Sequence, residues 1–366
     1  MEFQLNEEQK MWRDVVHNFC QKEVAPRAAQ TDHEAKTPMD IIKKMAPIGL
    51  LGLPVPEEDD GPGLDYVSIA IAIEELGRAC GSTALSIAAH SGLGLNPIIR
   101  WGTAEQKAKY IPQLMSGDYL GSLALTEPSA GSDLVNGVKT KAVLDGDTWV
   151  INGSKAWITN PSFSSFITTL CRTDENARTR GFSMIIVEVD REGLIISPPE
   201  KKMGLKGSPT NMLSYDNVRV PKENLLGEEG RGLHQALATL DVGRITIGAM
   251  AVGLAFGKPI GQHQSIQNKI ADMATLVEAS RLLVYQSAWL KGNDKPFTTQ
   301  AAMAKLFASE ASEKAAFEAI QIHGGYGYSP EYPVERIYRD QRLLSIGEGT
   351  NEILRMVIGR KVLAGE

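Results

Sequence analysis

The chain has 366 residues, a formal net charge of −6 and 43% hydrophobic residues, so it can form two or three domains with substantial cores. The mild acidity and the lack of a basic cluster argue against nucleic acid as a partner, and no run approaches the ~20 apolar residues of a membrane span. The three cysteines are scattered and the six histidines lack ligand spacing, so we expect no disulfides and no metal site. The acidic N-terminus "MEFQLNEEQKMWRDVV" is unlike an export signal, and we expect a cytoplasmic protein.

Residues 1–120 have the pattern of a helical domain. Apolar residues recur at helical spacing through "MWRDVVHNFCQKEVAP" and "DYVSIAIAIEELGRAC". Between these two segments, the Pro and Gly clusters of "GLPVPEEDDGPG" interrupt the spacing and predict a long loop.

From residue 121 to about 228 the apolar period changes to two. Short β-rich runs such as "TWVING", "FITTLC", "FSMIIVEV" and "NMLSYDNV" alternate with turn signals such as "LDGD" and "SPPE". This spacing predicts an antiparallel β-sandwich or barrel as the middle domain, in residues 121–228. Residues 229–366 are helical again, and segments near 265–291 and 298–323 are long enough for a C-terminal four-helix bundle. The predicted fold class is therefore mainly α with a central β domain.

Two segments of the β zone combine turn residues with groups that suit a ligand. In "GSLALTEPSAGSD", Pro128 cannot continue a central strand, and the small residues after it let backbone amides approach a ligand closely. A polar loop at a domain boundary explains the same residues equally well. In "NGSKAWITN", Trp157 suits core packing, but its ring beside Ile158 and the Thr159 hydroxyl also suits a planar cofactor such as flavin.

Two glycine-containing segments lie near the C-terminus. The glycine pair of "AIQIHGGYGY" predicts the end of a long helix. In "SIGEGTNEIL", Glu348 stands between two glycines, just before a helix start that Thr350 or Asn351 would cap. From these residues alone, Glu348 is either a solvated loop residue or a functional carboxylate.

In chain order, "LTEPSAGSD", "KAWITN", "LDVGR", "FGKPIGQHQ", "ADM", "QIHGGYGY" and "IGEGTNEI" resemble the successive signature segments of the acyl-CoA dehydrogenase family. The resemblance covers nearly the whole chain and is strongest to the short-chain, butyryl-CoA type. It implies the three-zone fold described above and an FAD-dependent enzyme that converts a short-chain acyl-CoA into the 2-enoyl-CoA. It also implies electron transfer to an electron-transfer flavoprotein and a homotetramer built as a dimer of dimers.

The resemblance makes Glu348 the catalytic base. It implies that Glu348 removes the α-proton while a hydride passes from the β-carbon to flavin N5. The thioester oxygen would be held by the backbone amide of the base and a ribityl hydroxyl of FAD. In an apolar pocket the pKa of the carboxyl group would be raised, which suits it to take a weakly acidic proton. Some relatives carry the base on the helix of "LDVGR", but that position is Gly243 here, which leaves Glu348 as the candidate.

The resemblance also implies binding residues. Thr350 and Asn351 would contact the dinucleotide phosphates, where a helix N-terminus suits an anion. Gln264 and the segment 321–325 would contact the FAD of a neighbouring subunit. The full set implied for FAD is Leu123, Leu125, Thr126, Gly131, Ser132, Trp157, Ile158, Thr159, Gln264, Gln321, Gly324, Gly325, Thr350 and Asn351. The set implied for acyl-CoA is Ser132, Asp241, Arg244 and Gly349.

The sequence departs from the family pattern at two places. Gly347 replaces the large aromatic residue that usually precedes the base, which suggests room for a branched or cyclic acyl group. Between Ala255 and Phe256, relatives have about four further helical turns, a hairpin and an Arg that contacts the FAD pyrophosphate across the dimer. Two alternatives therefore remain open: an acyl-CoA oxidase with the same site, and a non-catalytic acyl-CoA-binding scaffold that lost FAD with this segment.

Overall fold

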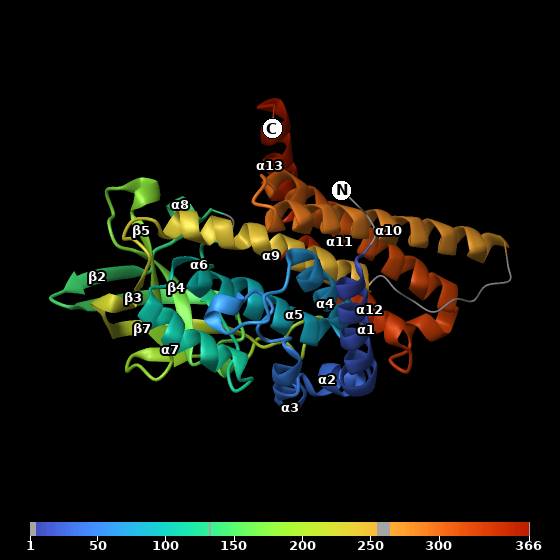
Figure 1. The fold of residues 1–366 in the computed structure, drawn as a ribbon, viewed down its shortest axis with the longest axis horizontal. Coiled ribbons are helices and arrows are strands. Elements are labelled where there is room, and N and C mark those ends of the chain that lie inside the picture. Colours follow the sequence, from blue (N-terminus) through green and yellow to red (C-terminus); the bar gives the residue numbers. More distant parts are fainter. Residues whose placement is uncertain (1–4, 132, 255–263, 366) are drawn as a thin grey trace.

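The computed structural model describes residues 5–131, 133–254 and 264–365. It confirms the predicted fold class, because the chain is mainly helical and its middle part forms a β-sheet. In Figure 1 the sheet lies at one end of an elongated molecule, and helix α9 (Gly232–Leu254) extends from it towards the long C-terminal helices at the other end. The segment between Ala255 and Phe256, where the sequence departs from the family, falls outside the described residues.

The N-terminal region folds into helices, and polar side chains cap the starts of the first, fourth and seventh α-helices. Asn6 and Gln9 form a reciprocal capping box at the first helix, and Asp65 accepts a hydrogen bond from the Ser68 amide at the start of the fourth. The first eight helices are α1 (Glu7–Phe19), α2 (Ala28–Glu34), α3 (Met39–Lys43), α4 (Tyr66–Ala79), α5 (Gly81–Ala89), α6 (Asn96–Trp101), α7 (Ala104–Met115) and α8 (Leu134–Gly137). The last of these belongs to the middle region of the chain.

The middle region forms one hydrogen-bonded sheet with the strand order β6-β7-β3-β2-β4-β5-β8, and β1 pairs with β4. Its strands are β1 (Leu123–Ala124), β2 (Lys141–Asp145), β3 (Thr148–Thr159), β4 (Phe166–Arg172), β5 (Phe182–Glu188), β6 (Leu194–Ile196), β7 (Thr210–Pro221) and β8 (Leu225–Leu226). Most neighbouring strands are antiparallel, as predicted, but β1 and β2 each pair with β4 in parallel. The domain boundaries near residues 120 and 228 stay predictions.

The sheet has a hydrophobic core on each face. Phe166 and Phe182 pack with residues of the N-terminal helices, such as Ile98. Ile167 and Ile185 belong to the same two strands but point to the opposite face of the sheet. They lie in a second core that consists of residues from the β region alone. The sheet therefore curves around this second core, as a sandwich or barrel does.

The C-terminal region contains α9, α10 (Gln264–Gly292), α11 (Thr298–His323), α12 (Pro333–Gln341) and α13 (Asn351–Leu363). Helices α9, α10 and α11 pack on one another, and α4 packs against α9 and α10. The predicted helices near 265–291 and 298–323 correspond to α10 and α11, and Gly324 ends α11 as the glycine pair predicts. Helix α13 projects from the body of the molecule (Figure 1).

Helix α9 is long and apolar enough to meet the length and hydropathy criteria for a membrane span, although we expected no such segment. However, 78% of its most apolar window is buried inside the protein, between the sheet, α4 and the other long helices. Its apolar composition is therefore that of a core helix.

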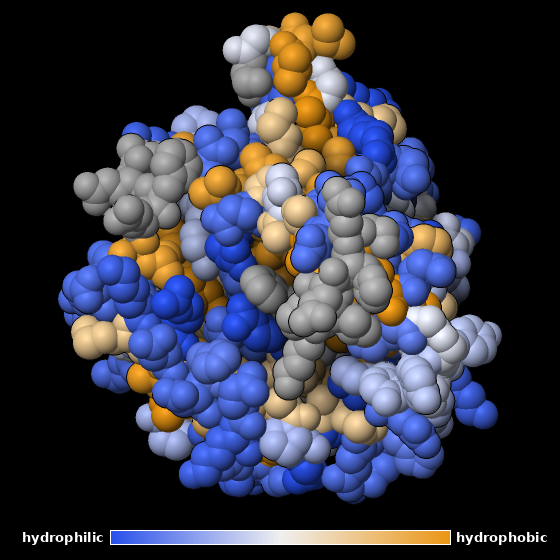
Figure 2. All heavy atoms as spheres, turned by 90° about the vertical axis from the view of Figure 1, so that its right-hand side faces the viewer, coloured by the Kyte–Doolittle hydropathy of each residue, from blue (hydrophilic) through white to orange (hydrophobic). Residues whose placement is uncertain are grey.

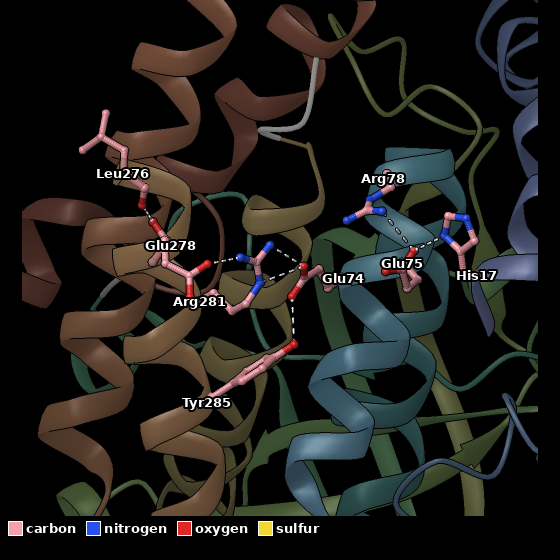
Figure 3. A network of polar contacts seen from close by, with 9 residues as sticks. His17, Glu74, Glu75, Arg78, Leu276, Glu278, Arg281 and Tyr285 are labelled. Carbon is pink, nitrogen blue, oxygen red and sulfur yellow. Dashed lines mark hydrogen bonds and ion pairs between the residues drawn. The ribbon is translucent and has the colours of Figure 1, made fainter. Parts of the chain in front are cut away.

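A buried ionic network joins α4 to α10 (Figure 3). Glu74 of α4 is only 4% exposed, and its Oε1 accepts hydrogen bonds from Nε (3.1 Å) and a terminal nitrogen (2.9 Å) of Arg281. The Tyr285 hydroxyl donates to Glu74 Oε2 at 3.2 Å. These contacts fix the position of α10 relative to the N-terminal helices.

Candidate active site

Glu348 lies in a tight turn that leads into α13. Its backbone φ is +52° and that of Gly349 is +97°, so two consecutive residues adopt the left-handed region. This region is uncommon for a residue with a side chain, and such strain is concentrated at functional sites. The Thr350 hydroxyl accepts a hydrogen bond from the Ile353 amide at 3.4 Å, which confirms Thr350 as the helix cap.

The carboxylate of Glu348 points into the protein and lies against α9. Its Oε2 atom is buried and has no hydrogen-bond partner among the described residues. A Cβ atom built on Gly243 would lie 2.0 Å from Oε2, so a side chain at position 243 would force this carboxylate to move. Burial raises the pKa of Glu348 to about 7, and the charges of Lys305 and Arg244 oppose that rise. A carboxylate with one buried, unpartnered oxygen and this pKa is suited to accept a proton near neutral pH.

Two cations lie near Glu348. Arg244 forms an ion pair with Asp241, whose second oxygen accepts a hydrogen bond from the Thr298 hydroxyl at 3.1 Å. The fully buried Lys305 donates from Nζ to the Gly349 carbonyl at 2.8 Å. The structure thus brings together Asp241, Arg244, Glu348 and Gly349, four of the residues implied by the resemblance.

Lys305 was missed by the sequence analysis. Its signal is visible afterwards in the spacing of α11, where Ala301, Lys305, Ser309 and Ser312 lie on the buried face. A lysine in such a helical apolar and small-residue stripe is exceptional, because lysine is almost never fully buried without a partner.

The two segments implied for flavin are adjacent in the structure. The Thr126 carbonyl accepts a hydrogen bond from the Ala156 amide at 2.9 Å, which joins "LALTEP" to "KAWIT". Trp157 lies at an irregularity in the pairing of β3 with β7, between Lys155 and Ile158, and has a φ of +61°. Trp157 is 61% exposed, so the alternative that it packs in the core is wrong. The neighbouring Ile158 is the residue that packs in the core. An exposed aromatic ring on a strained backbone suits the binding of a planar ligand.

A buried ion pair supports this region from behind. Lys155 Nζ donates to the Leu125 carbonyl at 3.1 Å and to Glu127 Oε1 at 2.9 Å, and both side chains are buried. Glu127 also accepts hydrogen bonds from the amides of Lys139 and Thr140. These contacts fix the turn that follows Leu125. The turn was expected from Pro128, but the pair of Lys155 and Glu127 was not.

Open space adjoins several of the remaining candidate residues. A Cβ atom built on Gly131, Gly324 or Gly325 would meet nothing within 4 Å, so a ligand can approach these backbones closely. Gln321, Gly324 and Gly325 are exposed at the end of α11, where a second subunit could reach them. Ser132 and the side chain of Gln264 lie outside the described residues. Taken separately, the exposed ring suits a flavin, and the N-terminus of α13 suits a phosphate group, the two parts of FAD.

The described residues contain no group of three His, Cys, Asp or Glu side chains placed to hold a metal ion. The fully buried His90 instead contacts the backbone on both sides: Nε2 donates to the Leu51 carbonyl at 2.8 Å, and Nδ1 accepts from the Gly121 amide at 2.9 Å. Burial lowers the pKa of His90 to about 4, so the ring is neutral. Its role is to fix the entry into β1.

Comparison with known proteins shows the family. The models of the acyl-CoA dehydrogenase N-terminal, middle and C-terminal domains match residues 6–118, 122–218 and 230–363. The probable acyl-CoA dehydrogenase YngJ of Bacillus subtilis is 48% identical over 380 residues, which cover 99% of this chain and 100% of the relative.

Two solved structures match over the same extent. Butyryl-CoA dehydrogenase from Megasphaera elsdenii is 39% identical with a TM-score of 0.95, covering 99% of this chain and 100% of that one. A structure described as the electron transferring flavoprotein of Acidaminococcus fermentans is 40% identical with a TM-score of 0.96 and the same coverage. This chain therefore belongs to the acyl-CoA dehydrogenase family, whose members are FAD-dependent oxidoreductases that act on the CH–CH group of acyl-CoA.

Proposed function

We propose that this protein dehydrogenates a short-chain acyl-CoA to the 2-enoyl-CoA, with Glu348 as the base that removes the α-proton. The observation that carries this proposal is the Oε2 atom of Glu348, which is buried, lacks a partner among the described residues and lies against a glycine. Bound FAD supplies the acceptor for the hydride that leaves the β-carbon. The electron pair of the broken α-C–H bond becomes the second bond between the two carbons, and the proton stays on Glu348.

The residues around Glu348 support this role. Gly243 leaves the space that the carboxylate occupies, and Gly349 lets the turn adopt its positive φ without strain. Arg244 and Lys305 lower the cost of an ionised carboxylate in a dry site. We propose that the segments ending at Thr126 and Thr159, with the exposed Trp157, hold the flavin, and that Asp241 and Arg244 contact the acyl-CoA.

The proposed substrate class rests on two observations. The similarity to butyryl-CoA dehydrogenase extends over the whole length of both chains, which favours a short acyl group. Gly347 precedes the base and has no side chain, so we propose that the site accepts branched or cyclic short-chain acyl groups as well as straight ones. A panel of straight, branched and cyclic acyl-CoAs tests this point through kcat/KM.

The test of the base is anaerobic reduction of the bound flavin by butyryl-CoA, which is monitored through the loss of the flavin's visible absorbance. We expect Glu348→Gln to keep FAD and acyl-CoA binding but to lose at least 10²–10⁴-fold in the reduction rate, because the amide cannot accept the proton. Glu352→Gln is the matched control, since Glu352 is an exposed carboxylate four residues away. Near-wild-type reduction by Glu348→Gln would refute the assignment.

We also propose that the electrons pass to an electron-transfer flavoprotein, which the similarity to the Acidaminococcus fermentans structure supports. Two further measurements separate the alternatives. Rapid reoxidation by oxygen after reduction would favour an acyl-CoA oxidase. A preparation that lacks flavin and cannot be reconstituted with FAD would favour a non-catalytic scaffold.

We propose a homotetramer in the cytoplasm. Large apolar side chains are exposed on α11 and on α13, which projects from the top of the molecule in Figures 1 and 2. They include Phe317, Met356, Val362 and Leu363, the last of which is 90% exposed. Exposed apolar patches of this kind mark interaction sites. Light scattering of the purified protein would show the number of subunits.

A further inference from the structure

Lys305 is a fully buried lysine without a carboxylate partner. It lies in the middle of α11, and its side chain is 0% exposed. Among the residues that the structure describes, no Asp or Glu oxygen lies within the 4.0 Å of an ion pair with its Nζ. An unpaired charge in the interior is costly, so its surroundings should show what it contributes.

Within the described residues, Lys305 Nζ donates to the turn that carries Glu348 and to the first residue of α13. Nζ donates to the Gly349 carbonyl at 2.8 Å and to Asn351 Oδ1 at 3.2 Å. Ser309, one turn further along α11, has its hydroxyl 3.1 Å from the same Asn351 oxygen. Helix α11 therefore holds the residues on the C-terminal side of Glu348 through buried polar contacts. These contacts restrain the turn in which Glu348 has a positive φ, a strained conformation that persists only where the surroundings determine it.

The electrostatic position of Lys305 differs from that of Arg244, the other nearby cation. Arg244 is paired directly with Asp241, so part of its charge is neutralised. The described hydrogen bonds of Lys305 go to neutral oxygens, and the carboxylates that act on its charge are those of Glu348 and Glu352. Burial lowers the pKa of Lys305 to about 8, which still leaves the ammonium mostly charged at pH 7. Its charge therefore acts on the base across a dry interior.

We propose that Lys305 is a positioning residue for the dehydrogenation: it fixes the Glu348 turn through Gly349 and Asn351, and its charge favours the carboxylate form of Glu348. This inference rests on the proposed role of Glu348. Lys305 itself does not touch the reacting atoms in this arrangement. Glu348 is thereby kept ready as a base in a site whose dryness would otherwise keep it protonated.

The test is the pH dependence of anaerobic flavin reduction by butyryl-CoA, measured on FAD-loaded protein from about pH 5.5 to about pH 9. For Lys305→Met, which keeps the length of the side chain but not its charge, we expect the acidic limb to move up by about 1 pH unit. The plateau rate should fall about 10-fold or more because the turn is no longer held. A purely structural role would lower the plateau without moving the limb.

Two variants serve as controls. Lys305→Arg keeps the charge, so the midpoint of the acidic limb should stay at its wild-type value even if the rate falls. Ser309→Ala removes a neighbouring contact to Asn351 without changing any charge, so its midpoint should also be unchanged. If Lys305→Met does not yield a folded holoenzyme, the Lys305→Arg profile decides, and a shifted midpoint in that variant overturns the proposal.

A second readout does not require turnover. The effect of Glu348→Gln on the melting temperature, followed against pH, reports where Glu348 ionises in the folded protein. In the Lys305→Met background this transition should occur at higher pH than in the wild-type background. An unmoved transition, together with an unmoved kinetic midpoint, would refute the role of Lys305. If the wild-type protein is not reduced by acyl-CoA, or if Glu348→Gln is reduced normally, the proposed function fails instead.

Discussion

The carboxylate of Glu348 lies directly against the Cα of Gly243, from which a built Cβ atom would stand 2.0 Å from Oε2 and 2.9 Å from Cδ. We therefore predict that Gly243→Ala displaces the carboxylate and lowers the rate of flavin reduction by about 10²-fold, because a misplacement of about 1 Å can have this effect. Gly92→Ala is the control, since its Cβ would make ordinary contacts at 3.8 Å with Gly243 and Thr246. Equal rates for the two variants would contradict the prediction.

The raised pKa of Glu348 predicts how stability and activity depend on pH. The folded-state pKa of about 7 exceeds the ordinary value of 4.5 for a glutamate carboxyl group, so the folded state binds more protons in this interval. The contribution of Glu348 to stability should therefore be lost as pH rises from about 4.5 to about 7, while activity rises through the same upper value.

Glu348→Gln removes this titration. The variant should match the wild type in melting temperature near pH 4.5 and have a higher melting temperature above about pH 7. The corresponding gain in the free energy of unfolding is on the order of 1–3 kcal/mol. Glu352→Gln, at an exposed site, should show no such widening difference. A constant difference between Glu348→Gln and wild type across the pH range would show that Glu348 ionises at its ordinary pKa.

The sequence predicted the long elements better than the contacts of the site. Helices α10 and α11 were predicted almost to their ends, because long apolar periodicity and glycine or proline stops define them. The strands β6 and β8 were missed, since two or three residues carry too little periodicity. The irregularity in β3 that exposes Trp157 has no local signal, because it arises from the pairing with β7.

Within the site, the resemblance pointed to Glu348, Asp241 and Arg244, which the structure places together. Lys305 and the pair Lys155 and Glu127 were not predicted, because a lysine in a helix or strand ordinarily faces solvent. Their roles depend on which carbonyl groups the fold brings to the Nζ atom, and these lie 44 and 30 residues away in the chain. Such contacts appear only once the tertiary structure is known.

Gly347 should control the shape of the acyl group that is accepted. A Cβ atom at this position would meet Leu343 at 3.6 Å, an ordinary contact, so a side chain can be introduced without moving the backbone. We predict that Gly347→Tyr lowers kcat/KM more for branched and cyclic acyl-CoAs than for butyryl-CoA, because its ring fills volume beside the base. Gly347→Ala should leave the order of substrates unchanged. Equal losses across the panel for the Tyr variant would show that position 347 does not affect selectivity.

The contact between Arg281 and Glu74 should be a major contribution to stability (Figure 3). Of the three hydrogen bonds to Glu74 described above, Arg281→Met removes the two from Arg281 and leaves the one from the Tyr285 hydroxyl. The Glu74 carboxylate remains buried. Removing one partner of a buried ion pair typically costs about 3–5 kcal/mol, because the remaining charge is uncompensated. We expect a clear fall in the melting temperature, measured at one scan rate because a protein of this size can unfold irreversibly.

Two further variants make this prediction specific to burial. Lys10→Met breaks the exposed ion pair with Glu7 on α1, whose side chains are 46% and 84% exposed, and should hardly change the melting temperature, because solvent screens the pair. Adding Glu74→Gln to Arg281→Met removes the uncompensated charge, so the double variant should recover part of the lost stability. If Arg281→Met melts like Lys10→Met, or if the double variant is less stable than Arg281→Met, then Glu74 is not a buried charge that depends on Arg281.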